Sequence, residues 1–204
     1  IDGTQGWVNV LDSTSNVRAN AFITATGGDP SQSGDYEIRT FLGPGTFCVS
    51  ATAACAADNV VDYLVVAGGG AGGFGDGGGG GAGGYRNSFS NPGAAGITVT
   101  ASPYAITVGG GGPTPGGPAV GPSGSDSIFS TITSAGGGGG GIGAACAGDG
   151  GSGGGASYNM PSGAGSGNTP AAPVLLGGPQ GNDGGNGTGN APLYGDSGGG
   201  GSGA

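Results

Sequence analysis

The chain of 204 residues contains neither histidine nor lysine, and it has a single glutamate. A serine nucleophile would therefore lack its usual base, and a zinc site made of cysteine and histidine cannot form. The aspartates stand isolated in glycine- or serine-rich turns, where each side chain can support its own turn. We therefore expect a protein that is not an enzyme and that uses neither a cofactor nor a metal ion.

Positive charge is scarce as well, since three arginines stand against twelve acidic residues and give a net charge of −9. Phosphate backbones would be repelled, so nucleic acid is not an expected partner. No stretch approaches the roughly 20 consecutive apolar residues that cross a bilayer, so membrane insertion is not expected either. The chain opens at Ile1 with neither a methionine nor a signal-like segment, and we expect it to be a processed or excerpted part of something longer.

Cysteine is limited to three residues, which is an odd number. Cys48 and Cys55 are separated by six residues and could form a disulfide, which would imply an oxidising location. The alternative is that both are small buried thiols. Cys146 has no obvious partner and is a free thiol, a packed small residue or an intermolecular bridge.

Glycine, in contrast, accounts for 59 residues and is concentrated in blocks that alternate with short β-strand patterns. Glycine loses more backbone freedom on folding than any other residue and offers no side chain to bury. Flexible linkers lack such interspersed strands, and collagen needs a glycine at every third position throughout. The pattern predicts an ordered, all-β fold: a small antiparallel β-sandwich with long glycine-rich connections.

Three regions are predicted along the chain. Residues 1–34 form a connecting or docking segment with short strands at 7–10 and 21–24. Residues 35–134 hold the β-sandwich strands, interrupted by glycine-rich blocks, and residues 135–204 form a glycine-rich region. Within the sandwich we expect a hairpin of 35–41 with 46–49, a central strand at 60–66, a second hairpin of 97–100 with 104–108, and a strand at 127–133.

The glycine blocks are too long to be ordinary loops of a compact domain. Block 68–84 has glycine at 69 and at every third position up to 84, while block 109–124 has only glycine or proline at every third position from 109. Block 136–157 has only glycine or alanine at every third position from 138. Because polyglycine II repeats every three residues, this period favours packed polyglycine II helices, with irregular loops as the alternative.

Four aromatic residues stand alone among small residues: Tyr85, Phe89, Tyr158 and Tyr194. A tyrosine offers a ring for stacking and a hydroxyl for hydrogen bonding, which suits recognition of a sugar or of a protein surface. We therefore predict these four as ligand-binding residues. The competing interpretation is that they cap glycine helices or fill gaps between strands.

Several stretches in a fixed order resemble the glycine-rich tail-fibre and adhesin-like proteins of aquatic tailed bacteriophages. The matching stretches are Ser33–Phe41, Gly45–Phe47, Val61–Gly70, Tyr104–Gly112 and Gly124–Gly136. The resemblance covers roughly residues 20–160. It implies a virion appendage located outside cells, assembled as a homotrimer with other virion proteins, whose distal glycine-rich loops bind a glycan or protein on the host surface.

Two other classes remain open. One is a self-assembling capsid-decoration or filament protein, in which the glycine blocks would be assembly contacts. The other is a glycine-rich extracellular or ice-binding protein, because flat polyglycine II bundles can present ordered threonine and asparagine. Threonine is concentrated in the strand segments here, which speaks against ice binding.

Overall fold

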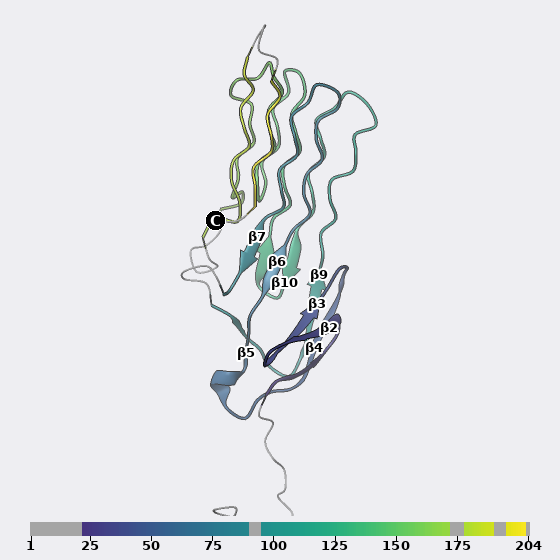
Figure 1. Cartoon of the computed structure of the whole chain (residues 1–204). Helices are drawn as coiled ribbons and strands as arrows, with labels where there is room; N and C mark the ends of the chain where they lie inside the picture. The colour runs from purple at the N-terminus through teal and green to yellow at the C-terminus, as the bar shows by residue number, and fades with distance from the viewer. Residues whose placement is uncertain (1–21, 90–94, 172–177, 190–194, 203–204) are drawn as a thin grey trace, which may run out of the picture.

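The computed structural model describes residues 22–89, 95–171, 178–189 and 195–202 (Figure 1). Among these residues the one helix is the 3-10 helix η1, far too short to span a membrane. The elements in chain order are β1 (Thr24–Thr26), β2 (Asp29–Ser33), β3 (Tyr36–Thr40), β4 (Gly45–Ala51), η1 (Ala56–Asp58), β5 (Val60–Val61), β6 (Leu64–Val66), β7 (Tyr85–Asn87), β8 (Ile97–Thr98), β9 (Pro103–Thr107), β10 (Ser127–Phe129) and β11 (Ile132–Ser134).

The strands form one five-stranded sheet, in the order β1-β4-β9-β10-β11, and three two-stranded ribbons, β2–β3, β5–β8 and β6–β7. Every pairing is antiparallel. The β6–β7 ribbon packs against β10 and β11, so the core lies between the large sheet and the small ribbons. The predicted fold class, a small antiparallel β-sandwich with long glycine-rich connections, is confirmed.

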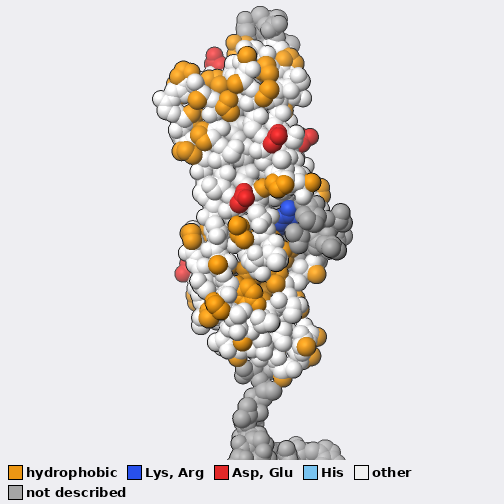
Figure 2. All heavy atoms as spheres, turned by 180° about the vertical axis from the view of Figure 1, so that it is seen from behind, with side chains coloured by type: hydrophobic (Ala, Val, Ile, Leu, Met, Phe, Trp, Pro, Cys, Tyr) orange, Lys and Arg blue, Asp and Glu red, His pale blue; other side chains and the backbone are white. Residues whose placement is uncertain are grey.

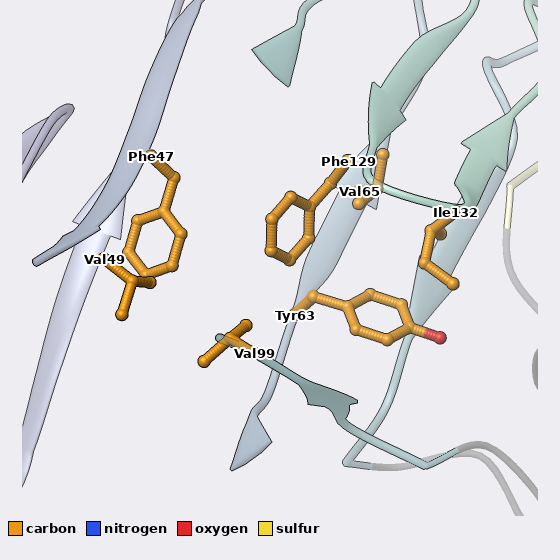
Figure 3. Packing of buried hydrophobic residues seen from close by; sticks show 7 residues of the cluster. All are labelled: Phe47, Val49, Tyr63, Val65, Val99, Phe129 and Ile132. Atoms are coloured by element: carbon orange, nitrogen blue, oxygen red, sulfur yellow. The ribbon is translucent and has the colours of Figure 1, made fainter. Parts of the chain in front are cut away.

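The core of the sandwich is built by alternation along short strands. In β4, Phe47 and Val49 point inward while their neighbours are exposed or half-buried, as the two-residue period of a strand requires. Figure 3 shows these two side chains with Tyr63, Val65, Val99, Phe129 and Ile132, which complete the buried cluster. The rings of Phe47 and Phe129 meet edge to face with their centroids 6.0 Å apart, a favoured aromatic geometry.

Two predicted hairpins are wrong in their pairing. β3 pairs with β2 through a tight turn at Gly34, whose φ of +59° suits glycine, and β4 pairs with β1 and β9 instead. Likewise β8 pairs with β5, while β9 lies between β4 and β10. The sequence patterns located these strands correctly, but β3 and β4 are not partners, and neither are β8 and β9, although each two are consecutive in the chain.

Two further strand predictions also need correction. Residues 60–66 form two short strands, and their burial alternates, with Tyr63 and Val65 buried but Leu64 52% exposed. The predicted central strand with both faces covered is therefore a one-sided ribbon. Residues 127–133 turn at Ser130, where φ is +54°, and form the hairpin β10–β11. The predicted strand at 7–10 lies outside the described residues, β1 begins at Thr24, and the division into three regions stays a prediction.

The glycine-rich blocks form a bundle of straight extended rods that continues from one end of the sandwich (Figure 1). Within the described residues there are ten such rods, which run alternately away from the sandwich and back. They are residues 67–73, 78–84, 109–112, 119–125, 135–141, 147–151, 152–157, 163–168, 180–187 and 195–201. Blocks 68–84 and 109–124 therefore each form a hairpin of two rods, and block 136–157 spans three rods.

Hydrogen bonds join the rods to one another with a period of three residues. Backbone N–H groups at 67, 70 and 73 donate to the carbonyls at 84, 81 and 78, over 2.8 to 3.0 Å. Those at 68, 71 and 74 donate to the carbonyls at 125, 122 and 119 of a different rod. A three-residue repeat whose hydrogen bonds all run sideways is the arrangement expected of packed polyglycine II helices.

The rod at 135–141 lies at the centre of the bundle. It exchanges backbone hydrogen bonds with five other rods, namely 67–73, 78–84, 119–125, 147–151 and 152–157. At Gly136, Gly137, Gly138, Gly139, Gly140 and Gly141, a Cβ would come within 3.0 Å of a backbone atom on a neighbouring segment. At Gly69 and Gly72 the nearest such atom is 3.5 Å away, an ordinary contact. Glycine is thus required on every side of a central rod but on only some sides of an outer one.

Candidate functional site

Four loops and the ends of two further rods gather at the end of the bundle that points away from the sandwich (Figure 1). Each of these loops joins a rod to the next along the chain. We call the loops and rod ends together the distal surface; it consists of the described residues 74–77, 113–118, 142–147, 157–162, 188–189 and 195–196. The described chain begins at residue 22, at the opposite end of the molecule.

The loops of the distal surface are held in place by hydrogen bonds to neighbouring segments. The backbone N–H of Phe74 donates to the carbonyl of Ala119 over 3.2 Å, and Gly77 pairs with Ile142 in an antiparallel bridge. On the other side, the N–H of Gly189 donates to the carbonyl of Tyr158 over 2.8 Å. The loops at 74–77, 142–147 and 158–162 are therefore preformed, because each is bonded to another loop or rod end.

Apolar side chains are prominent on the distal surface. Phe74 is 44% exposed, Pro161 is exposed, and Ile142 and Met160 are half-buried. Figure 2 shows hydrophobic side chains gathered at this end and again around the sandwich, with a largely white glycine surface between them. Two carboxylates also lie on the distal surface, that of Asp76 in a loop and that of Asp196 at a rod end.

The predicted ligand-binding aromatics do not form one site. Tyr158 lies in a distal loop, where its N–H donates to a carboxylate oxygen of Asp196 over 2.9 Å. Tyr85 begins β7 and is half-buried, and Phe89 follows the same strand with 62% of its surface exposed, so both lie at the sandwich end. Tyr194 lies outside the described residues. The structure therefore separates Tyr158 from Tyr85 and Phe89 by the length of the bundle.

Sequence reasoning missed three residues of the distal surface, Phe74, Ile142 and Met160. A signal for the first two was present, because each interrupts a run of glycine or alanine with one large apolar side chain. Such a side chain cannot enter a lattice of closely packed rods, so it marks the place where a rod ends. Of the described residues of the distal surface, only Tyr158 had been predicted as ligand-binding.

The three cysteines are free thiols in the structure. Cys48 is half-buried in β4, while Cys55 is exposed just before η1, so they are not the pair of buried thiols considered as an alternative. The disulfide between them stays a prediction. Cys146 is exposed in the distal loop 142–147.

Buried polar groups join the bundle to the sandwich. The Gln180 side chain, 1% exposed, accepts a hydrogen bond from the N–H of Ala135 at 2.8 Å and donates one to the carbonyl of Pro170 at 2.9 Å. Arg86, 4% exposed, donates from Nε to the carbonyl of Thr133 at 2.7 Å. These contacts fix the positions at which the glycine-rich rods leave the strands of the sandwich.

Two buried ionisable groups, those of Tyr63 and Arg86, have shifted pKa values because they are shielded from water. Burial raises the pKa of the Tyr63 phenol and lowers the pKa of the Arg86 guanidinium, and the two groups influence each other electrostatically. The Tyr63 hydroxyl and one terminal nitrogen of Arg86 are buried, and neither has a hydrogen-bond partner among the described residues. The contact region between the bundle and the sandwich, which we call the joint, is therefore polar, and some of its buried polar atoms have no hydrogen-bond partner among the described residues.

Elsewhere, a shallow open hollow on the β2–β3 ribbon is lined by Pro30, Ser31, Gln32 and Glu37. In the part of the chain that the structure describes, no three His, Cys, Asp or Glu side chains come together as metal ligands would. The distal surface is thus the best-organised candidate site.

Comparison with known proteins gives one match. A family model described as a glycine-rich domain matches residues 40–204, which includes most of the sandwich and the whole bundle. No curated protein and no solved structure matches the chain.

Proposed function

The chain belongs to the family of glycine-rich domains, and from this premise and its resemblance to phage fibre proteins we propose that it is a virion structural protein of a tailed bacteriophage. It is a non-enzymatic component of a tail fibre or similar appendage, located outside cells and used in host-surface recognition. Its ligand is a glycan or a protein of the host surface.

One observation carries this proposal: loops from several rods meet on the distal surface, at the end opposite to the start of the described chain (Figure 1). A rigid bundle that projects loops away from its attachment is suited to present them to a target. Because the rods hold both ends of each loop, binding costs little ordering of the loops. Loops carried on a rigid scaffold are a common location for recognition residues.

The sandwich end supports assembly with other copies and with other virion proteins. Among the described residues, eight of the nine exposed large hydrophobic side chains lie there, all except Phe74. Leu64 and Val66 are about half exposed on the outward face of the β6–β7 ribbon. Exposed apolar patches of this kind mark interaction sites, and we propose a homotrimer, whose three distal surfaces would strengthen weak contacts by acting together.

The test is immunogold electron microscopy with antibody against this chain, on virus particles from the culture that produces it. Label at tails or fibre tips is the expected result. Sedimentation of the purified protein should give three times the monomer mass.

Other labelling patterns would contradict the proposal. Label spread over capsids or along filaments would replace recognition with the assembly role, and label confined to cell surfaces would exclude a phage appendage. If thermal hysteresis accompanied that last pattern, the ice-binding alternative would take its place.

A further inference from the structure

Charge on the distal surface has one sign. The three arginines are Arg18, Arg39 and Arg86, and the chain has no lysine, so no residue after 86 carries a fixed positive charge. Arg86 itself is buried at the sandwich end. The carboxylates of Asp76 and Asp196, in contrast, lie on the distal surface. A ligand rich in phosphate, sulfate or carboxylate would find no cation there to bind.

Several polar side chains of the distal surface are already engaged within the protein. Asp196 accepts the N–H of Tyr158, and the Thr188 hydroxyl accepts the N–H of Gly195 over 3.0 Å. Ser157 and Asn159 are bonded to each other over 3.1 Å. Recognition of a neutral sugar relies on polar groups that converge on the ring hydroxyls, and these groups instead stabilise the loops.

What the surface does offer is apolar area beside negative charge. Phe74 is 44% exposed, and Ile142, Met160 and Pro161 add apolar surface in neighbouring loops. Phe74 also lies two residues from Asp76, whose carboxylate is exposed. A lysine or arginine side chain could pair with the carboxylate and place its cation against the ring.

We infer that the distal surface binds a protein, namely an exposed receptor loop that combines apolar side chains with lysine or arginine. This inference rests on the proposed function and specifies its ligand. Charge complementarity and apolar contact both favour such a loop over an anionic glycan. Because the loops are preformed, a small apolar contact suffices for measurable binding, and three copies increase it further.

The experiment measures binding of the purified, fluorescently labelled protein to host cells, and its ability to block phage adsorption. Host cells are used untreated, after protease digestion of surface proteins, or after periodate oxidation of surface glycans. Protease should lower binding at least tenfold, whereas periodate should change it less than twofold. The reverse pattern would establish a glycan receptor and overturn the inference while leaving host recognition intact.

Failure of the proposed function gives a different result. If the protein neither binds untreated host cells nor slows adsorption, host recognition itself is wrong, and the identity of the ligand is no longer at issue.

Variants locate the contact. Phe74→Ser should weaken binding at least tenfold, and the double change Asp76→Asn with Asp196→Asn should weaken it severalfold and reduce its dependence on salt. Asparagine at 196 keeps an oxygen that can accept the N–H of Tyr158, so the loop is retained. The matched controls at the sandwich end are Asp35→Asn and Asp58→Asn, at two exposed carboxylates.

The controls should bind within twofold of the unmodified protein. If the folded distal variants bind as well as the controls, the receptor contacts another surface and the inference is wrong. Thermal unfolding of every variant checks that folding is preserved.

Discussion

The two halves of this molecule are held together by different means. In the sandwich, a cluster of apolar side chains such as Phe47, Val99 and Phe129 is removed from water. In the bundle, the buried residues are glycine with a few alanines and serines, and the rods are joined through backbone hydrogen bonds. Side-chain burial stabilises the first region, and close backbone packing with lateral hydrogen bonding stabilises the second.

This difference determines which substitutions each half tolerates. A sandwich core accepts hydrophobic exchanges of similar volume, because neighbouring side chains can repack. A central rod faces rigid backbone on all sides, so there is no space for even one added methyl group. The bundle is therefore the more easily damaged half, although it has the simpler composition.

Gly139→Ala should give the largest effect. A Cβ at Gly139 would overlap the carbonyl oxygen of Gly121, and that rod could move away only by breaking its hydrogen bonds to the central rod. We expect a loss of more than about 3 kcal/mol in the free energy of unfolding, at or beyond the upper range for overpacked cores. Urea denaturation followed by circular dichroism measures it.

Gly110→Ala is the matched control on an outer rod. A Cβ there meets no atom within 4 Å, so the change should be neutral, or stabilising by about 0.4–1 kcal/mol through the unfolded chain. Equal losses at both positions would show that the rods are not packed as described.

Gln180→Ala tests the joint between the two halves. The change leaves the buried N–H of Ala135 without its partner and also removes the hydrogen bond to the carbonyl of the exposed Pro170. We expect the free energy of unfolding to fall by about 1–3 kcal/mol, the cost of one orphaned buried group. Urea denaturation again provides the measurement.

Asn186→Ala is the control for a lost amide. Asn186 is exposed and accepts the N–H of Ala164 at 3.2 Å, a bond that water can replace. Its loss should stay below about 1 kcal/mol. If Gln180→Ala cost no more than this control, the joint would not depend on the buried amide.

The sequence predicted the strands and the glycine-rich rods better than it predicted how they pair and where they turn. Strand positions followed from alternation, but the partners of β3 and β9 did not, because pairing depends on how distant segments meet. In block 68–84 the predicted close-packed column is right for Gly78, Gly81 and Gly84, where a Cβ has no room, and wrong for Gly69 and Gly72, where it has. The block folds back on itself near residue 75, and a turn made of glycine leaves little trace in a glycine-rich sequence.

The candidate site was predictable in part for a related reason. Large side chains within the blocks must lie at rod ends, and this argument could have located Phe74 and Ile142, whereas Tyr158 was predicted because it stands alone among small residues. Which rod ends share one surface depends on the direction of every rod, and no local pattern encodes that. The lone aromatics Tyr85 and Phe89 belong to the sandwich end because they directly follow a returning rod.

Tyr63→Phe should have the smallest effect and the opposite sign. The Tyr63 hydroxyl is buried without a hydrogen-bond partner, so its removal should raise the free energy of unfolding by up to about 1 kcal/mol at neutral pH. Tyr104→Phe is the contrast, because the Tyr104 hydroxyl accepts the N–H of Thr100 at 2.8 Å, and its removal should destabilise the protein. A destabilised Tyr63→Phe protein would show that the hydroxyl does find a partner.

The effect of pH separates the same two tyrosines. Burial raises the pKa of Tyr63, so above pH 10 the unfolded chain loses this proton first, and the stability linked to Tyr63 falls as pH rises. Hydrogen bonds with Ser102 and Thr100 lower the pKa of Tyr104, so its contribution to stability grows as pH rises towards 10. Urea midpoints at pH 7 and near pH 10.5 should therefore show the advantage of Tyr63→Phe over the unmodified protein increasing with pH. An advantage that shrank instead would mean that water reaches the phenol, and with it the joint between the sandwich and the bundle.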